Sequence, residues 1–322
     1  MGKWVAIVVG GLAVVVGGAF AVLYTVFPMV SEAESIRIER STDRVTRGQY
    51  LAHHVFVCID CHSERELDVY SMPPVRSLEF GGGLAYTREM GMPGTIVSRN
   101  ISPGVLREWS DGEIVRAIAA GVSRDGRPLF PLMPYQAYGT LDREDINAVV
   151  AYMRVIAPVN RPIPDTKVDF PVNLLMRLMP RDPTFRTKPH PRDPVAYGRY
   201  LVTSAGCGDC HTQRDAQGNL TGPEFGGGQE FLVPERFLAR SANITPDPDT
   251  GIGAWTKDAF IARFKSRTEA DYRAMPAPRG QPNTVMPWWG YAGMTPEDLG
   301  AIYDYLRTVA PVKNQVVKFE PR

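Results

Sequence analysis

The longest apolar stretch of the chain lies at its N-terminus. The 24 residues from Trp4 to Phe27 contain no charged side chain, and Lys3 precedes them. At a rise of about 1.5 Å per residue, a helix of this length is long enough to cross the hydrocarbon core of a bilayer. The pattern predicts a transmembrane anchor over residues 1–30, followed by a juxtamembrane linker over residues 31–44.

A cleaved secretory signal is the alternative to an anchor. Ala19, Phe20 and Ala21 have the small-x-small pattern of a cleavage site. The chain stays apolar from Val22 to Val30, however, so cleavage near Ala21 would leave a hydrophobic new terminus. For this reason we favour an uncleaved helix over the signal peptide.

Two segments farther along show the period of amphipathic helices. One is expected to open at Asp142 and the other at Thr295, because a capping side chain precedes apolar positions at i, i+3, i+4 and i+7. Such stripes face a hydrophobic core. The expected core stripes are Ile146, Val149, Val150 and Met153 in the first helix, and Leu299, Ile302, Tyr303 and Leu306 in the second.

Shorter helices are predicted upstream of these two. A middle helix should begin at Ser110, where Glu113 can complete a capping box, and its counterpart should begin at Thr256. Earlier helices are expected near Thr46 and near Asp193, which is followed by proline at the first helical position. Since no segment alternates convincingly with a period of two, we predict a mostly α fold with long loops.

Residues 48–157 and residues 198–310 repeat one another. An internal repeat indicates two copies of one structural unit, and it shows which residues that unit uses twice. The matching stretches are GQYL from Gly48 and GRYL from Gly198, CIDCH from Cys58 and CGDCH from Cys207, EFGGG from Glu79 and from Glu224, NISP from Asn100 and NITP from Asn243, and MPYQAY from Met133 and MPWWGY from Met286.

The repeat predicts two tandem domains, over residues 45–158 and 195–316. Residues 159–194 between them carry eight prolines and should form a linker, and residues 317–322 a tail. The linker contains one apolar patch, from Leu174 to Met179. We expect this patch to lie against a domain, although contact with the membrane or a partner is also open.

Composition narrows the function classes. The 322 residues carry 36 Lys and Arg against 35 Asp and Glu, a net charge of +1, so the chain has no basic footprint for nucleic acid. An apolar fraction of 44% is sufficient for ordinary hydrophobic cores. The four cysteines fall into two pairs with none left over, which directs attention to the chemistry of those pairs.

Each cysteine pair has the form Cys-x-x-Cys and is followed directly by a histidine. Two thiols at this spacing on a helical turn can each form a thioether with one vinyl group of a haem, and the imidazole then reaches the iron. A redox dithiol or half a zinc site also uses Cys-x-x-Cys, but neither explains the histidine in both repeats. The sequence therefore predicts two covalently bound haem c groups, held by Cys58, Cys61 and His62 and by Cys207, Cys210 and His211.

A sixth iron ligand must come from outside these motifs. Met133 and Met286 occupy equivalent places in the two repeats, each before a proline and each 12 residues before an aspartate of the last helix. Met275 also precedes proline, but it lies in a stretch that the first repeat lacks. We predict Met133 and Met286 as the axial ligands opposite the two histidines. His/Met ligation leaves no open position on iron, so the predicted chemistry is transfer of one electron per haem.

Other residues near the motifs are expected to have structural roles. Gly48 and Gly198 should let another helix approach closely, because glycine has no Cβ. His53 and His54 occur only in the first repeat, so we interpret them as half-exposed helix residues rather than as ligands. Tyrosines should meet where the first and last helices cross, Tyr50 with Tyr152 and Tyr200 with Tyr305.

Both repeats resemble class I cytochrome c domains. NITPDPDTGIG from Asn243 and MPWWGYAGMTPEDL from Met286 are similar to cytochrome c subunits of periplasmic membrane-bound alcohol and gluconate dehydrogenases, and the resemblance covers nearly all of residues 45–312. Those subunits typically carry three haems, whereas this chain has two motifs and an N-terminal span of its own. The resemblance implies single-pass attachment to a bacterial cytoplasmic membrane, with both haem domains in the periplasm, or secretion to the periplasm if the chain is cleaved near Ala21.

Three function classes follow from these observations. The first is a membrane-anchored dihaem cytochrome that carries single electrons from a periplasmic or membrane donor to a respiratory acceptor. The second is the electron-accepting cytochrome subunit of an alcohol, aldehyde or sugar dehydrogenase complex, and the third is a dihaem peroxidase. In the first two the chain is an electron-transfer protein rather than an enzyme. Its partners would be redox proteins such as a dehydrogenase, a quinol-oxidising complex or a terminal oxidase.

Overall fold

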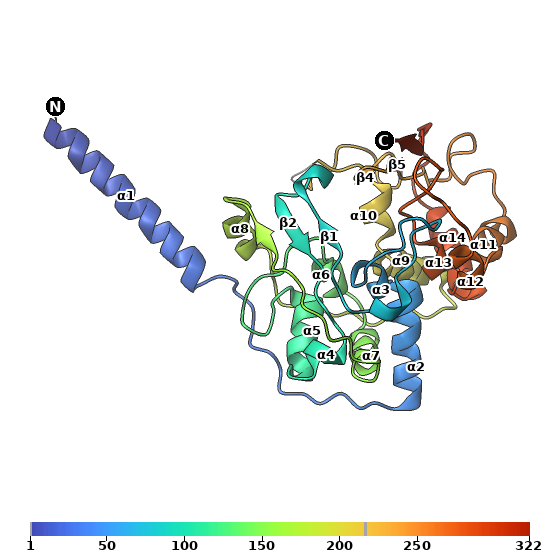
Figure 1. Cartoon of the computed structure of the whole chain (residues 1–322), viewed down its shortest axis with the longest axis horizontal. Coiled ribbons are helices and arrows are strands. Elements are labelled where there is room, and N and C mark those ends of the chain that lie inside the picture. Colours follow the sequence, from blue (N-terminus) through green and yellow to red (C-terminus); the bar gives the residue numbers. More distant parts are fainter. Residues whose placement is uncertain (1, 216–217) are drawn as a thin grey trace.

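A computed structural model describes residues 2–215 and 218–322. Its most distinctive feature is the helix α1 (Gly2–Thr25), which extends away from the rest of the chain (Figure 1). None of its residues is buried, and it is the one helix in the described residues that is long and apolar enough to cross a membrane. The expected N-terminal apolar helix is therefore present. Its length and composition fit an anchor and a signal sequence alike.

The remaining helices form one body, and most of them are short. Those of the first repeat are α2 (Thr42–Tyr50), which continues as one π-helical turn (Leu51–Val55), α3 (Cys58–Cys61), α4 (Pro103–Leu106), α5 (Asp111–Ala120), α6 (Tyr135–Tyr138) and α7 (Arg143–Met153), with 3-10 turns at Arg76–Leu78 and Arg88–Met90.

The second repeat keeps the helix order of the first, but within its described residues it has no counterpart of α4 and it has one added helix. The linker contributes α8 (Val172–Leu175) and a 3-10 turn (Met176–Leu178) before the second repeat begins. The added helix, α12 (Glu269–Arg273), lies just before Met275, in the stretch that the first repeat lacks. The helices of the second repeat are α9 (Pro194–Ser204), α10 (Cys207–His211), α11 (Lys257–Lys265), α12 (Glu269–Arg273), α13 (Trp288–Tyr291) and α14 (Pro296–Leu306).

Most of the predicted helix starts are confirmed by their caps, including that of Asp193, whereas α2 begins at Thr42 rather than near Thr46 and has no side-chain cap. Ser110 and Glu113 form the full capping box that opens α5. The side chains of Asp142, Thr256 and Thr295 each accept a hydrogen bond from a backbone N–H in the first turn of the helix that follows. These bonds satisfy amide donors that a helix N-terminus leaves without a partner, which is why the start positions were readable in the sequence.

Glycine permits a close crossing of the first and last helices in each repeat. A Cβ placed on Gly48 would lie 1.9 Å from the carbonyl oxygen of Ala148 in α7, and one placed on Gly198 would lie 1.9 Å from that of Ala301 in α14. Both are far shorter than any van der Waals contact. The expectation that these glycines allow close approach of another helix is therefore confirmed.

Gly198→Ala should destabilise the protein by about 3 kcal/mol or more, because the added methyl group can be accommodated only by separating α9 from α14. The matched control is Gly300→Ala on α14, where a Cβ meets only the side-chain ends of Lys257 and Ile261, at 3.6 and 3.7 Å. That control should be neutral or slightly stabilising, since alanine favours the helix. Thermal unfolding followed by circular dichroism checks both. Equal melting temperatures for the two variants would contradict the close crossing.

The structure also contains strands, which the sequence did not predict. The first sheet has the order β1 (Ala85–Tyr86), β2 (Gly94–Val97) and β3 (Lys167–Val168), and the second has β4 (Glu230–Val233), β5 (Phe237–Arg240) and β6 (Phe319–Pro321). All neighbouring strands are antiparallel, with Gly94 opposite Val168 and Leu238 opposite Glu320. Strands of two to four residues are too short to show a period of two, so the pattern missed them.

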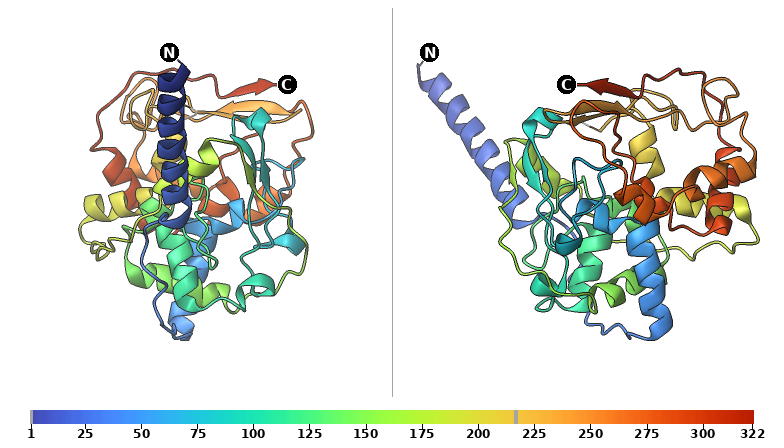
Figure 2. Two further views of the ribbon diagram at one scale, coloured as in Figure 1. Left: turned by 90° about the vertical axis from the view of Figure 1, so that its left-hand side faces the viewer. Right: turned by 45° about the vertical axis from the view of Figure 1, so that its right-hand side comes forward.

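Two of these strands come from segments that were predicted to be linker and tail. β3 lies in the Pro-rich segment and pairs with β2, while β6 lies in the C-terminal segment and pairs with β5 (Figures 1 and 2). Both segments are therefore tied to the body by backbone hydrogen bonds.

One hydrophobic core extends through both repeats. A single cluster of buried residues contains Leu51 and Ile146 from the first repeat together with Leu201 and Leu299 from the second, each with no exposed surface. The predicted stripes are buried, with Tyr303 half-buried at the edge. A smaller cluster of Met72, Val233, Phe237 and Ala239 also joins residues of both repeats. Because they share one core, the two repeats form one body.

Candidate functional site

Each Cys-x-x-Cys-His motif lies on a short helix that starts abruptly. α3 follows Val57 and α10 follows Gly206, and both preceding residues have left-handed backbone conformations, with φ of 48° and 65°. The turn brings the two cysteines of each motif onto one helical turn. All four cysteines are free of disulfides. The arrangement is the one expected for two thiols that react with a single planar group.

The two histidines are held in the same way. Nδ1 of His62 donates a hydrogen bond to the carbonyl oxygen of Arg99, and Nδ1 of His211 donates to that of Ala242, both at 2.7 Å. Burial lowers the pKa of each imidazole, which favours the neutral form, although the bond to the carbonyl acts in the opposite direction. With Nδ1 carrying the proton, Nε2 keeps its lone pair. A neutral imidazole with a fixed tautomer and a free Nε2 is suited to bind a metal.

The repeated glycine runs support these histidines. The backbone N–H of Gly82 donates to the carbonyl oxygen of His62, and that of Gly227 donates to the carbonyl oxygen of His211, both at 2.8 Å. The two glycines have φ of +69° and +71°, and a Cβ on either would lie within 2.6 Å of the backbone just before Asn100 or Asn243. Glycine is required there because the loop passes directly over the segment that supplies the carbonyl to the histidine.

Met133 and Met286 lie at equivalent places, half-buried against the shared core. Each stands two residues before a short helix, α6 or α13, and the end of that helix returns to the motif of its own repeat. The hydroxyl of Tyr138 in α6 donates to the carbonyl oxygen of Phe56, at 3.4 Å, just before Cys58. The hydroxyl of Tyr291 in α13 donates to that of Ala205, at 2.7 Å, just before Cys207.

The same tyrosines show that the two motifs lie near each other. Burial raises the pKa of Tyr138 well above its ordinary value, and Cys58 and Cys61 of its own repeat and Asp209 of the second motif add to this effect. Burial likewise raises the pKa of Tyr291, with further contributions from Cys207, Cys210 and Asp60 of the first motif. Each tyrosine is thus close enough to both motifs to be affected by charges on them.

The Met286 loop is held by the other repeat. Ser71 of the first repeat donates its hydroxyl to the carbonyl oxygen of Met286 and accepts from the N–H of Trp288, at 2.9 Å. His54 donates from Nδ1 to the carbonyl oxygen of Gly290, at 2.8 Å. The position of the second predicted methionine ligand is therefore set partly from outside its own repeat, which the sequence did not reveal.

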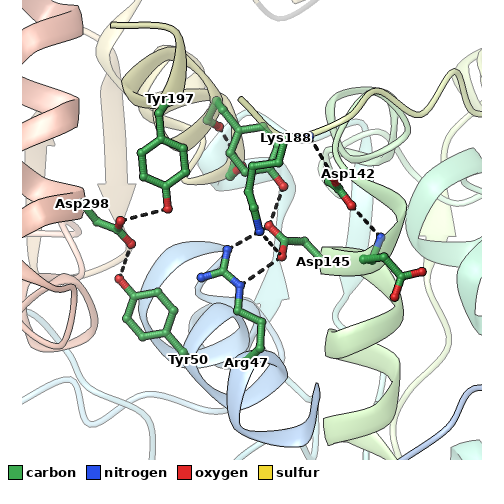
Figure 3. Close-up of polar contacts among 10 residues, drawn as sticks. Arg47, Tyr50, Asp142, Asp145, Lys188, Tyr197 and Asp298 are labelled. Atoms are coloured by element: carbon green, nitrogen blue, oxygen red, sulfur yellow. Dashed lines mark hydrogen bonds and ion pairs between the residues drawn. The ribbon is translucent and has the colours of Figure 1, made fainter. Parts of the chain in front are cut away.

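Two aspartates connect the repeats reciprocally (Figure 3). Asp145 of the first repeat accepts from the hydroxyl of Tyr200 in the second, at 2.7 Å, and Asp298 of the second accepts from the hydroxyl of Tyr50 in the first, at 2.6 Å. Asp298 also accepts from Tyr197 of its own repeat, at 2.9 Å. Because Tyr50 and Tyr200 hold equivalent places, as do the aspartates, the contact has approximate two-fold symmetry.

These contacts correct one expectation. Tyr50 and Tyr200 were expected to meet Tyr152 and Tyr305, but their hydroxyls instead bond to carboxylates of the opposite repeat, which are stronger acceptors than a phenol. His53 and His54 are half-buried in the helix, as expected, and each also forms a hydrogen bond. His53 shares a hydrogen bond of 2.7 Å with the hydroxyl of Tyr152, while His54 holds the Met286 loop.

Asp145 forms more hydrogen bonds and ion pairs than Asp298 does. Its side chain is 3% exposed and accepts from Arg47, at 3.0 and 2.9 Å, and from Lys188, at 2.9 Å. Burial alone would raise the pKa of this carboxyl. The hydrogen bonds and charge of Arg47, with help from Lys188 and Tyr200, outweigh burial and hold the pKa below its ordinary value. The carboxylate is therefore charged in the folded protein.

Asp145→Asn should destabilise the protein by roughly 2–3 kcal/mol at neutral pH, because Arg47 and Lys188 lose a buried counter-charge while remaining partly open to solvent. A depressed pKa gives stability that is complete above about pH 4 and is lost as the pH falls through the folded-state value. The difference from wild type should therefore shrink in acid. Urea unfolding at pH 7 and below pH 4 measures it.

The control is Asp169→Asn, which breaks an exposed ion pair with Arg88 and should have little effect at either pH. A loss from Asp145→Asn that stayed constant from pH 7 to below pH 4 would show that the charge of Asp145 is not what stabilises the contact.

The donors present fit a haem better than a zinc ion or a redox dithiol. Within the described residues, no group of three or more His, Cys, Asp and Glu side chains could hold a metal ion by itself. Burial raises the pKa of Cys58 and Cys207 to about 12, whereas reactive dithiols have lowered values. The buried donors Tyr135 Oη, Tyr272 Oη and Trp289 Nε1 have no hydrogen-bond partner within the described chain, and the propionates of a haem are acceptors of the kind they lack.

Comparison with known proteins agrees with this chemistry. Residues 195–310 match the sequence model of the cytochrome c family, described as "Cytochrome c". The chain is 30% identical over 285 residues to the cytochrome c subunit of the quinone alcohol dehydrogenase of Gluconacetobacter polyoxogenes. The aligned region covers 83% of this chain and 56% of that protein.

Two further relatives have related names. The fructose dehydrogenase cytochrome subunit of Gluconobacter japonicus is 30% identical over 284 residues, covering 82% of this chain and 52% of the relative. A diheme cytochrome c-type protein of Cereibacter sphaeroides is 26% identical over 217 residues. The aligned region covers 65% of this chain and 70% of that relative. The chain thus spans about half the length of the two dehydrogenase subunits. Residues 195–310 therefore form a cytochrome c domain, a kind of domain that holds its haem covalently.

Proposed function

We propose that this chain is a membrane-anchored cytochrome c that carries single electrons through two haems, one in each repeat. A haem c at each site would supply a one-electron couple between ferric and ferrous iron. The thioether bonds would come from Cys58 and Cys61 and from Cys207 and Cys210, and the axial ligands would be His62 with Met133 and His211 with Met286.

The matched fixation of the two histidines carries this proposal. In both repeats, Nδ1 donates to a backbone carbonyl at 2.7 Å and a glycine N–H holds the histidine carbonyl at 2.8 Å. A motif that had lost its haem would have no need to preserve the tautomer of its histidine. The equal geometry therefore supports use of both motifs.

The other residues of the chain would tune and position the two sites. With Met133 and Met286 as the second protein ligands, neither iron would have an open position for peroxide or dioxygen, and the thioether sulfur would favour the reduced state. The shared core and the reciprocal contacts of Asp145 and Asp298 hold the two sites at a fixed separation. A rigid spacing is what repeated electron transfer between two sites requires.

We propose a dehydrogenase subunit as the electron donor. Supporting this choice, relatives named as cytochrome subunits of alcohol and fructose dehydrogenases align over more than four-fifths of the chain. A respiratory component of the membrane, such as a terminal oxidase or a quinol-oxidising complex, would be the other redox partner. With α1 as an uncleaved single-pass anchor in the bacterial cytoplasmic membrane, both haem sites would face the periplasm.

Carbon monoxide binding separates an electron carrier from a peroxidase. The reduced, purified protein should show no spectral change under carbon monoxide, because no iron has an open position. Tight binding at either iron would overturn the doubly His/Met-ligated carrier. Purification from native membranes tests the partner. A stoichiometric flavin- or quinone-dependent dehydrogenase subunit is expected, and a chain that consistently purifies alone would refute the dehydrogenase complex.

A further inference from the structure

The linker and the N-terminal helix meet at one point. The α8 segment, here residues 170–178, lies at the edge of the body nearest the C-terminal end of α1, and the three views agree on this (Figures 1 and 2). The guanidinium of Arg177 donates to the carbonyl oxygens of Leu23, Tyr24 and Phe27, at 2.6 to 3.1 Å, and lies 5.1 Å from the centre of the Tyr24 ring. It thereby satisfies carbonyls that the end of α1 would otherwise leave without partners.

The α8 segment also reaches beyond the end of α1, toward its middle. The ring of Phe170 stacks on that of Phe20, with centroids 6.2 Å apart and planes 11° apart. Phe20 is five residues before the end of α1, or about 7 Å along the helix axis. A helix of 24 residues is about 36 Å long and exceeds a hydrocarbon core of about 30 Å by only a few ångströms at each end. With α1 centred in the bilayer, the Phe170 ring would therefore lie a few ångströms inside the edge of the apolar layer.

Most of the exposed side chains of the α8 segment are apolar, with Asn173 as the exception. Phe170, Leu175 and Leu178 are 68%, 51% and 44% exposed, whereas the intervening Leu174 and Met176 are buried. Adjacent exposed hydrophobic side chains of this size are unusual on a surface that meets only water. A short segment with exposed apolar side chains beside the end of a membrane-spanning helix is suited to an interfacial contact with lipid.

The α8 segment is fixed to the first repeat rather than loosely attached. β3 pairs with β2 just before it, the N–H of Asp169 donates to the carbonyl oxygen of Pro93 at 2.8 Å, and Asp169 pairs with Arg88. At its other end, the side-chain amide of Gln136 donates to the carbonyl oxygen of Met179 at 3.1 Å. Whatever holds the α8 segment therefore holds the first repeat as well.

We propose that Phe170, Leu175 and Leu178 insert into the outer interface of the bilayer that α1 spans. This inference rests on the proposed anchor and extends it. The protein then meets the membrane at two joined points, the helix and the α8 segment, so that the first repeat keeps one orientation to the bilayer. The occupant is lipid, because the exposed Phe170 ring stacks on Phe20 and so extends the exposed apolar surface of α1.

Spin labelling of the full chain in lipid nanodiscs tests this contact. Because all four native cysteines are expected in thioether bonds, Leu175→Cys would provide one free thiol for a nitroxide. Its label should collide more often with oxygen, which concentrates in lipid, than with a water-soluble nickel chelate. The matched control is Val105→Cys on α4, a site 44% exposed and far from α1 in Figure 1, where the preference should be reversed.

The remaining outcomes of this experiment distinguish failure of the lipid contact from failure of the anchor. If intact mass retains residues 1–30 and the label at position 175 prefers nickel as at position 105, the lipid contact is refuted while the anchor stands. A label shielded from both reagents would indicate a protein contact and would also refute it. A mass that lacks the residues up to Ala21 would overturn the anchor, and this inference with it.

Discussion

A chain in which Cys207 and Cys210 are both replaced by alanine should carry one covalent haem instead of two. Each thioether pair serves one porphyrin, so loss of the second pair leaves the first attached. The pyridine haemochrome absorbance per mole of protein measures this directly. The Cys58→Ala, Cys61→Ala variant should also retain one haem, and the variant lacking all four cysteines should retain none. Because the two repeats share one core, each single-haem variant should also unfold at a lower temperature.

Unchanged covalent haem in the variant without Cys207 and Cys210 would contradict the assignment of that motif. A wild-type chain that carried only one covalent haem would contradict the proposal of two haem sites. Heat-denatured protein run on a gel and stained for haem distinguishes covalent from trapped haem in every variant.

Met286→Ala should remove about half of the far-red charge-transfer absorption of the oxidised protein, because that absorption reports sulfur bound to ferric iron and two such sites are expected. It should also open one iron to carbon monoxide. Met275→Ala is the matched control. Met275 is likewise half-buried in the core and precedes proline, but its place has no counterpart in the first repeat. The absorption should survive this change.

The reverse result, with loss of the absorption from Met275→Ala alone, would refute the ligand assignment. Ser71→Ala provides a finer test of the same site. Removing the hydroxyl frees the carbonyl of Met286 and the N–H of Trp288, so it should weaken the charge-transfer absorption without lowering the haem content.

Features set by side chains within a few residues of one another could be predicted from the sequence. Ser110 with Glu113, and Thr295 before its proline, carry their own capping chemistry, and the structure has helix starts at both. Gly48 and Gly198 were recognised as places of close approach because the repeat uses glycine twice. These predictions needed only local geometry and a comparison of one repeat with the other.

Features set by backbone atoms or by distant segments could not be predicted. The carbonyls of Arg99 and Ala242 that orient the two histidines leave no mark in the sequence, because every residue has a carbonyl. The one signal is indirect, since both residues stand directly before the repeated Asn-Ile pair. The contacts of Ser71 with Met286 and of Tyr50 with Asp298 cross between repeats, and periodicity within one segment carries no information about such pairs.

An anaerobic reductive titration of the purified full-length protein tests the central claim most directly. The account predicts uptake of two electrons per chain in one-electron steps, with the charge-transfer absorption of the oxidised protein lost in two parts and restored on reoxidation. Uptake of a single electron, or a charge-transfer absorption that belongs to only one of the two steps, would contradict two His/Met-ligated haems acting as carriers.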